Sequence, residues 1–192
     1  KVEFELHQAA NTLEVDSVFL YEFPHGANTS CVDSGDGKLF LQARGGVGNY
    51  TFFLSGFEDT VSVTKSSSVH WFTDLSAVDN NGRPILYTVR LRDELSCQWN
   101  PRDTLNRIRL TPPQKPDLLW EIISETAPDF EIPCRGDMAM IRVRGKGGHY
   151  PYYARIGDKT KPITTPDSFA DFPLYAGSHE ISLLDELGCA AT

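Results

Sequence analysis

The sequence has 192 residues, of which 40% are hydrophobic and 23% are charged, and its formal net charge is −8 at pH 7. This composition is typical of a globular protein, and the length allows one large domain or two of about 90 residues. The negative charge argues against nucleic acid and anionic membrane surfaces as partners, and no apolar stretch reaches the roughly 20 residues of a membrane-spanning helix. We therefore expect no nucleic-acid partner and a protein that is not embedded in a membrane.

Apolar residues recur along the chain with the two-residue period of β-strands. After the leading segment VEFELHQ (2–8), the segment DSVFLYEF (16–23) reads as extended. Alternating runs follow at residues 39–43, 87–91 and 141–143. Side chains with this period point alternately into a core and into water, and turn sequences such as DSGDG (33–37) separate the runs. We therefore expect short antiparallel strands.

Landmarks of the first half recur in the same order in the second half. Each copy has a cysteine, a strand that enters a glycine-rich turn, an aromatic strand, and a strand that closes in Asp-Glu-Leu, a small residue and cysteine. In the first copy these are CVDSGDGKLFLQARGG (31–46), RGGVGNYTFF (44–53) and YTVRLRDELSC (87–97). In the second they are CRGDMAMIRVRGKGG (134–148), RGKGGHYPYY (144–153) and HEISLLDELGC (179–189). The chain therefore contains an internal repeat of two units.

The stretch between the copies predicts a joint. It contains RIRLT (107–111), expected to be the last strand of the first copy, followed by three prolines that favour a semi-rigid connection. The next segment, DLLWEIISE (117–125), is the one candidate helix, but its Trp, its two Ile and its extended counterpart at 16–23 favour a strand. We expect an all-β protein with two tandem antiparallel β-sandwiches, residues 9–113 and 114–192.

The leading segment VEFELHQ (2–8) has the same place before the first copy as IRLTPPQ (108–114) has before the second. No matching strand follows Cys189. We therefore interpret residues 1–8 as the last strand of a preceding repeat, and we expect the second sandwich to lack its last strand. Our hypothesis is that neighbouring chain covers the edge exposed in this way.

Both units resemble the SprB-type repeat of very large surface adhesins of gliding Bacteroidetes and of related secreted proteins. The resemblance rests on Asp36-Gly37, Gly45-Gly46, Tyr50 and the segment Asp93 to Cys97, and on Gly147-Gly148, Tyr150 and the segment Asp185 to Cys189. Ser96 stands where the family usually has Gly, and His179 stands where it usually has the tyrosine seen here as Tyr87.

This resemblance implies two tandem immunoglobulin-like antiparallel β-sandwich domains at the cell surface, with neighbouring repeats of the same long chain as partners. The expected function is that of a repeat segment in an adhesin or stalk, which spaces and presents a binding region. The resemblance also makes Ser17, Thr60 and Thr104 candidate glycosylation sites, because each lies in an Asp-Ser/Thr-apolar triplet of the kind that Bacteroidetes O-glycosylate on exported proteins.

The glycine-rich turns are predicted to be structural. Two sets of glycines, at 45, 46 and 48 and at 145, 147 and 148, are expected to supply positive backbone φ angles where one strand turns into the next. A phosphate-binding loop would open a helix, and neither copy has this pattern.

The aromatic residues beside these turns are expected to alternate between core and surface, since successive residues of a strand face opposite sides. Packing and strand pairing explain most of them. An exposed Phe53 or Tyr153 could instead stack against a sugar. The alternative function is therefore a carbohydrate-binding module of a secreted protein with surface polysaccharide as its partner, and a third is an accessory domain of a secreted hydrolase.

No sequence motif points to catalysis or to a resident cofactor, so we do not expect an enzyme. The five histidines have no paired metal-ligand spacing. Asp33, Asp36 and Asp79 lie in turns that resemble pieces of a calcium loop but lack its distant bidentate Glu. The same sequences are ordinary hairpin turns, so calcium remains an open alternative.

A cysteine opens and another closes each unit, which indicates disulfides in an oxidising compartment. Two pairings remain open. Cys31–Cys97 and Cys134–Cys189 would close each unit. In an immunoglobulin-like Greek key, however, these partners lie at opposite poles, beyond the ~7 Å between α-carbons that a bridge permits. Cys31 would then bond Cys189 across the joint, and Cys97 and Cys134 would pair outside this segment.

Overall fold

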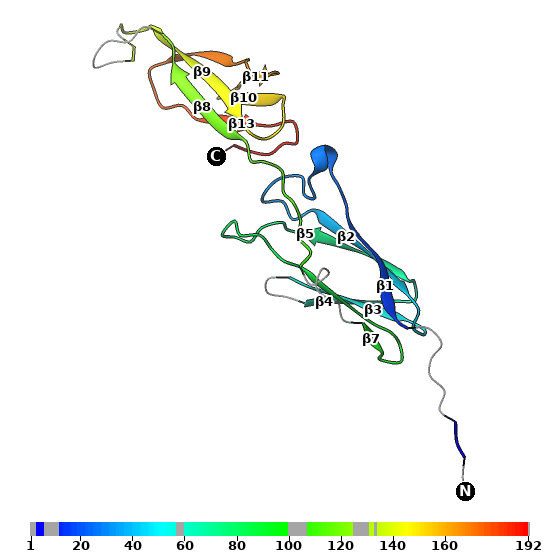
Figure 1. Ribbon diagram of the computed structural model, residues 1–192. Helices are drawn as coiled ribbons and strands as arrows, with labels where there is room; N and C mark the ends of the chain where they lie inside the picture. The colour runs from blue at the N-terminus through cyan, green and yellow to red at the C-terminus, as the bar shows by residue number, and fades with distance from the viewer. Residues whose placement is uncertain are drawn as a thin grey trace. The chain divides into compact units, whose positions relative to one another are not determined.

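The computed structural model describes residues 3–5, 12–56, 60–99, 107–124, 131–132 and 134–191. The chain divides into two compact units, residues 1–112 and 113–192, so the division lies one residue before the predicted boundary (Figure 1). All strand pairs among the described residues are antiparallel, and no α-helix occurs there. The predicted all-β antiparallel architecture is therefore confirmed.

Unit 1 contains two sheets. The first has the order β1-β2-β5 and consists of β1 (Glu14–Leu20), β2 (Gly37–Arg44) and β5 (Val69–Leu75). The second has the order β4-β3-β6-β7 and consists of β3 (Tyr50–Ser55), β4 (Thr60–Lys65), β6 (Thr88–Arg92) and β7 (Gln98–Trp99). A short 3-10 helix, η1 (Pro24–Gly26), lies between β1 and β2. The chain crosses between the sheets from β2 to β3, from β4 to β5 and from β5 to β6.

One buried cluster receives side chains from both sheets of unit 1. Leu39 and Leu41 of β2 are fully buried, and they belong to the same cluster as Phe52 of β3 and Val89 of β6. The alternation seen in the sequence therefore directs the apolar side of each strand into one shared core, as in a sandwich of two sheets. Leu110, from the predicted last strand, is also fully buried in this cluster.

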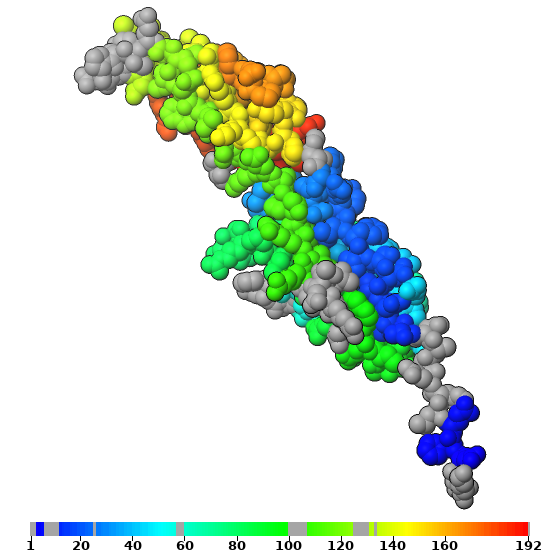
Figure 2. Space-filling model, in the orientation of Figure 1, coloured from blue at the N-terminus to red at the C-terminus, as the bar shows by residue number. Residues whose placement is uncertain are grey.

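Unit 2 contains two sheets with the same plan. The first has the order β12-β9-β8 and consists of β8 (Asp117–Ile122), β9 (Met138–Lys146) and β12 (Ala170–Tyr175). The second has the order β11-β10-β13 and consists of β10 (Tyr152–Ile156), β11 (Lys159–Ile163) and β13 (Ile181–Leu184). Its buried cluster includes Val143, Tyr152, Phe172 and Leu183. On the side shown in Figure 2, residues of β8 to β11 form much of the surface of this unit.

The strands β8 to β13 correspond in order and pairing to β1 to β6. Within the candidate helix 117–125, residues Asp117–Ile122 form the strand β8, as its Trp and Ile residues predicted. The last strands differ from expectation. RIRLT (107–111) forms a single bridge, between Ile108 and Tyr87, and the counterpart of β7 in the described part of unit 2 is a bridge between Leu184 and Ala190.

Candidate functional site

The repeated sequence landmarks meet around a buried carboxylate in each unit. In unit 2, Asp185 is 2% exposed, and its Oδ1 accepts hydrogen bonds from the backbone N–H groups of Leu187 (3.0 Å) and Cys189 (2.9 Å). Its Oδ2 accepts a third from the N–H of His149 in the glycine-rich turn, at 3.2 Å. We call this carboxylate and the two loops that it joins the loop junction.

Unit 1 has the same junction. Asp93 is 3% exposed, its Oδ1 accepts from the N–H of Cys97 at 2.8 Å, and its Oδ2 accepts from the N–H of Val47 at 3.1 Å. A backbone hydrogen bond from Glu94 N–H to the Val47 oxygen adds a second link between the loops, at 3.1 Å. Because a buried carboxylate needs hydrogen-bond partners, the loops that supply them are held together.

The glycine of each junction is required by space as well as by backbone conformation. Gly46 and Gly148 have φ angles of +69° and +57°. A Cβ at Gly148 would lie 2.8 Å from Asp185 Oδ2, and one at Gly46 would lie 3.1 Å from Asp93 Oδ2. The predicted positive φ angles are found at Gly45, Gly46, Gly48, Gly147 and Gly148. The glycine-rich turns therefore accommodate an internal carboxylate.

Gly145 does not follow this prediction. It lies within β9 and is not among the residues with positive φ. A Cβ at this position would collide with the ring of Tyr152. The Tyr152 side chain is fully buried, and its hydroxyl donates to the carbonyl oxygen of Gly147. Burial disfavours the phenolate and raises the pKa of Tyr152 to about 12.

The structural counterpart of Tyr50 is Tyr152, and not Tyr150 as the repeat motif predicted. The strand register shows this: Thr51, after Tyr50, pairs with the residue before Asp93, and Tyr153, after Tyr152, pairs with the residue before Asp185. The hydroxyl bond does not distinguish the two tyrosines, because Tyr50, Tyr150 and Tyr152 each donate to the carbonyl oxygen five residues earlier. The second turn has a different composition after its glycines, so alignment on the first tyrosine shifts the aromatic strand by two residues. A shift of two residues keeps each side chain on the correct face of the strand, but it identifies the wrong tyrosine as the counterpart of Tyr50.

In the closing turn of unit 1, Ser96 replaces the usual glycine in a backbone conformation that favours glycine. Ser96 has a φ of +66° and its counterpart Gly188 has a φ of +81°. In both turns the N–H of this residue donates to the carbonyl oxygen of the junction aspartate, at 3.1 Å for Ser96 and 3.0 Å for Gly188. The left-handed conformation is costly for a residue with a side chain. Unit 1 therefore contains local strain that unit 2 avoids.

The two predicted sugar-stacking residues do not occupy equivalent positions. Phe53 is half-buried, with the guanidinium carbons of Arg90 and Arg92 at 5.9 and 5.5 Å from its ring centroid. It lines a hollow of about 450 Å³ with these two arginines, and Thr60, Leu91 and Gln98 complete the lining. Tyr153 is 44% exposed, and on its own sheet it lies opposite Pro162 and Leu184. The predicted alternation of buried and more exposed aromatics is thus present in both strands.

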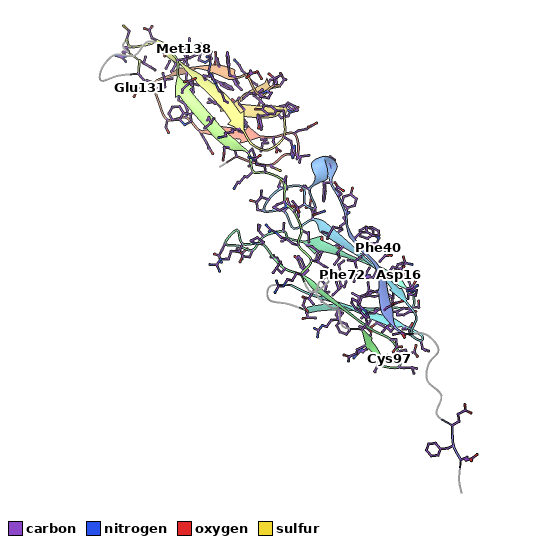
Figure 3. The ribbon with its side chains drawn as sticks, in the orientation of Figure 1. Asp16, Phe40, Phe72, Cys97, Glu131 and Met138 are labelled. Carbon is purple, nitrogen blue, oxygen red and sulfur yellow. The ribbon has the colours of Figure 1, made fainter. Side chains whose placement is uncertain are left out.

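Sequence reasoning missed an aromatic row on the outer face of the β1-β2-β5 sheet. Phe19, Phe40 and Trp71 lie directly opposite one another on the three strands. Phe40 and Phe72, both labelled in Figure 3, belong to this sheet, but Phe72 is 4% exposed and part of the core. The rings of Phe19 and Phe40 are stacked, with centroids 4.3 Å apart, so the pair turns ring faces toward each other. A sugar platform requires an open ring face, and the stacking leaves at most one face of each of these two rings open.

The outer face of the β12-β9-β8 sheet contains a charged cluster. Arg142 donates to both carboxylate oxygens of Asp171 at 2.9 Å, and its guanidinium carbon lies 3.5 Å from the ring centroid of Phe169. The hydrogen bonds from Arg142 hold the pKa of Asp171 below its ordinary value. Arg144 and Glu121 form a second, longer pair at 3.5 Å. These charges largely neutralise one another.

The calcium candidates lie in two places: Asp33 and Asp36 in the segment 33–37, and Asp79 in the turn at 79–83. Asp36 Oδ1 accepts from the N–H of Ser30 at 3.0 Å, and Asp79 Oδ1 accepts from the N–H groups of Asn81 and Arg83, both at 2.8 Å. Asp79 thus organises an ordinary hairpin turn. Its buried Oδ2 has no partner among the described residues. Those residues contain no group of three or more His, Cys, Asp or Glu placed to bind a metal ion together.

The cysteines fall into two classes. Cys31 and Cys189 are disulfide-bonded, whereas Cys97, labelled in Figure 3, and Cys134 have exposed free thiols. The pairings Cys31–Cys97 and Cys134–Cys189 are therefore not formed, because each would use one of the free thiols. The pairing of Cys31 with Cys189 stays a prediction, as does the pairing of the other two outside this segment.

Two of the three predicted glycosylation sites lie in described residues. Ser17 is half-buried on β1, and its hydroxyl donates to Asp16 at 3.2 Å. Thr60 is exposed on β4. Thr104 lies outside the described residues. No helix in the described part of the chain is long and apolar enough to cross a membrane.

Comparisons with known proteins identify no relative. A scan against protein-family models found no match, and neither did a search of curated proteins. Functional inference therefore depends on the geometry of the chain itself.

Proposed function

We propose that the chain is a pair of immunoglobulin-like, SprB-type repeats in an extracellular adhesin or stalk, which spaces and presents a binding region at the cell surface. The observation that carries this proposal is the duplication of one sheet topology with one loop junction in each unit. Duplicated units of this kind are typical of arrays in which each member extends the chain. Neighbouring repeats of the same long chain are the proposed partners.

The strand order supports the immunoglobulin-like part of the proposal. As in such domains, the first, second and fifth strands of unit 1 lie in one sheet and the third, sixth and seventh in the other. The fourth strand, β4, lies beside β3, as the C′ strand lies beside strand C in the variable type, and not in the first sheet as in the constant type. Tyr87, just before β6, donates its hydroxyl to the carbonyl oxygen of Ser76 at 2.8 Å. A tyrosine at this corner that bonds backward to the chain is a recurrent feature of these sandwiches. In unit 2, His179 Nε2 lies 2.8 Å from the carbonyl oxygen of Tyr175.

The disulfide-bonded state of Cys31 and Cys189 supports an oxidising, extracellular setting. The test is a non-reducing peptide map by mass spectrometry on protein from its native source. We expect both residues to be oxidised and sugar to be attached at Ser17, Thr60 or Thr104. Four reduced cysteines without any glycan would contradict both the exported stalk and the family resemblance.

A second candidate function is carbohydrate binding at Phe53. The hollow beside this ring favours it, because two arginines and the polar Thr60 and Gln98 surround an aromatic side chain there. Such a lining suits a sugar with a carboxylate group. A glycan array should then show binding to acidic polysaccharides that Phe53→Ala abolishes and that Tyr175→Ala, at a more exposed aromatic, leaves intact. A spacer alone should bind none.

A further inference from the structure

Arginines on the outer faces of the sheets pair with carboxylates at several places in the described residues. The pairs are Arg44 with Glu14, Arg142 with Asp171, and Arg144 with Glu121. Arg90 and Arg92 of β6 are different, because both are exposed and neither has a carboxylate partner within the part of the chain that the structure describes. These two cations lie on one strand of a chain whose formal net charge is −8. Their donor groups are available to an external anion.

Both arginines lie on the outer face of the β4-β3-β6-β7 sheet. Arg90 is directly opposite Phe53 of β3, and Arg92 is opposite Thr51 of β3 and Gln98 of β7. The other residues that strand pairing places on this face are Ser55, Thr60, Ser62, Thr64 and Thr88. None of these described strand positions is acidic, so the face combines positive charge with hydroxyl groups.

The ring of Phe53 keeps the two guanidinium groups near each other. Their carbons lie 5.9 and 5.5 Å from its ring centroid, which is the range of a cation–π contact. The hollow of about 450 Å³ lies beside them, with Thr60 and Gln98 in its lining. Two guanidinium groups beside one ring repel each other, and an oxyanion that accepts from both offsets this repulsion. The planar donor fork of arginine fits such oxygens.

Unit 2 shows that the sandwich forms without this pair. The junction aspartates set the register, in which Phe53, Arg90 and Arg92 correspond to Arg155, Ser182 and Leu184. The β11-β10-β13 sheet thus has one arginine at these positions, and its Nε donates to the carbonyl oxygen of Gly157 at 2.9 Å. Strand pairing and core packing of the repeat therefore do not explain Arg90 and Arg92. Their arrangement suits the binding of a ligand by unit 1.

We propose that Arg90 and Arg92 together bind the carboxylate or sulfate groups of an acidic polysaccharide on the outer face of the β4-β3-β6-β7 sheet. The anionic group is the main contact, Phe53 positions the two guanidinium groups, and Thr60 and Gln98 hydrogen-bond sugar hydroxyls. The inference rests on the second candidate function above and specifies what that site recognises. Because the anion supplies the affinity, a neutral glycan is not bound.

The experiment is titration calorimetry on the full chain, produced without glycosylation because Thr60 lines the hollow. The probes are polygalacturonic acid, dextran sulfate and neutral dextran, at about 0.15 M salt, where the Debye length of about 8 Å screens the net charge of the chain. We expect an acidic polymer to bind and dextran not to bind, and the tighter acidic polymer identifies the anionic group. Arg90→Gln and Arg92→Gln should each weaken binding at least tenfold, as expected for loss of charged hydrogen bonds.

Arg155→Gln is the matched control, because it changes the net charge equally at an exposed position on the corresponding sheet of unit 2. It should leave binding unchanged, and an equal loss would refute the site. Dextran binding that survives Arg90→Gln and Arg92→Gln would support the carbohydrate function and overturn this inference. Polyglutamate binding as tight as that of the acidic polysaccharides would show that the proposed occupant is wrong. If no probe binds, the site and the second candidate function fail together, and the spacer role is unaffected.

Discussion

Replacing Asp185 by Asn should destabilise unit 2 strongly, although it changes only one atom of the side chain. The carboxylate accepts three backbone hydrogen bonds, at 3.0, 2.9 and 3.2 Å, in a site that is 2% exposed. An amide retains one acceptor oxygen and presents an NH₂ group to at least one of these donors. At least one buried N–H then loses its partner, and the remaining bonds lose the contribution of the charge.

The loss of stability expected for Asp185→Asn follows from these hydrogen bonds. A hydrogen bond to a charged group contributes about 1.5–3 kcal/mol, and an unsatisfied buried donor costs about 1–3 kcal/mol. Allowing for overlap between the two, we expect Asp185→Asn to lower the free energy of unfolding by about 2–4 kcal/mol. Unit 2 spans residues 113–192, and a domain of this size has about 4–12 kcal/mol of stability. The substitution should therefore remove a substantial fraction of it.

The assay combines urea denaturation with hydrogen exchange in the two loops. Protection should fall at His149 and at Leu187 to Cys189 before it falls in β9 or β10. Asp93→Asn is the matched variant in unit 1 and should cost about 1.5–3 kcal/mol, because its carboxylate accepts two backbone bonds. Asp167→Asn, at an exposed turn, should stay within about 0.5 kcal/mol. If all three substitutions had equal effects, the loop junction would not stabilise the units as argued.

Three further predictions use smaller perturbations. Ser96→Gly should raise the free energy of unfolding of unit 1, and Gly188→Ser should lower that of unit 2, by about 0.5–1 kcal/mol each, because both positions have positive φ. Thermal unfolding measures both, and effects of the same sign would contradict this. Tyr152 keeps its proton to a pKa of about 12 when folded but only to about 10 when unfolded, so its contribution to stability is present below pH 10 and declines toward pH 12. Alkaline unfolding scans should show a smaller loss in Tyr152→Phe than in the unmodified chain, and equal losses would refute the assignment. A non-reducing digest should yield one peptide that joins Cys31 to Cys189, and separate linkage of either residue to Cys97 or Cys134 would exclude that pairing.

The sequence was sufficient to predict the class of fold and the duplication. Alternation at residues 39–43 and 141–143 identified strands, because a period of two separates core from solvent in any sheet with one buried face. The positive φ angles of most turn glycines could also be predicted, since the need for a positive φ is a local property of a turn. Gly145 was the exception. Its requirement comes from the ring of Tyr152 on another strand, and no local pattern shows such a contact.

The candidate sites were less predictable. Phe53 and Tyr153 were selected by the same rule, yet one lies beneath two arginines and the other faces solvent, because cross-strand neighbours determine what surrounds a side chain. The row of Phe19, Phe40 and Trp71 depends on strand register, which sequence spacing does not fix.

The sequence by itself determined that this protein has two copies of one β unit, and that each glycine-rich turn requires residues with positive φ. Only the tertiary structure showed that Asp93 and Asp185, part of an apparently ordinary closing turn, are buried acceptors for a second loop. The physical reason is that periodicity and turn chemistry are local properties, whereas a buried carboxylate and a filled core depend on residues that meet only after the strands have paired.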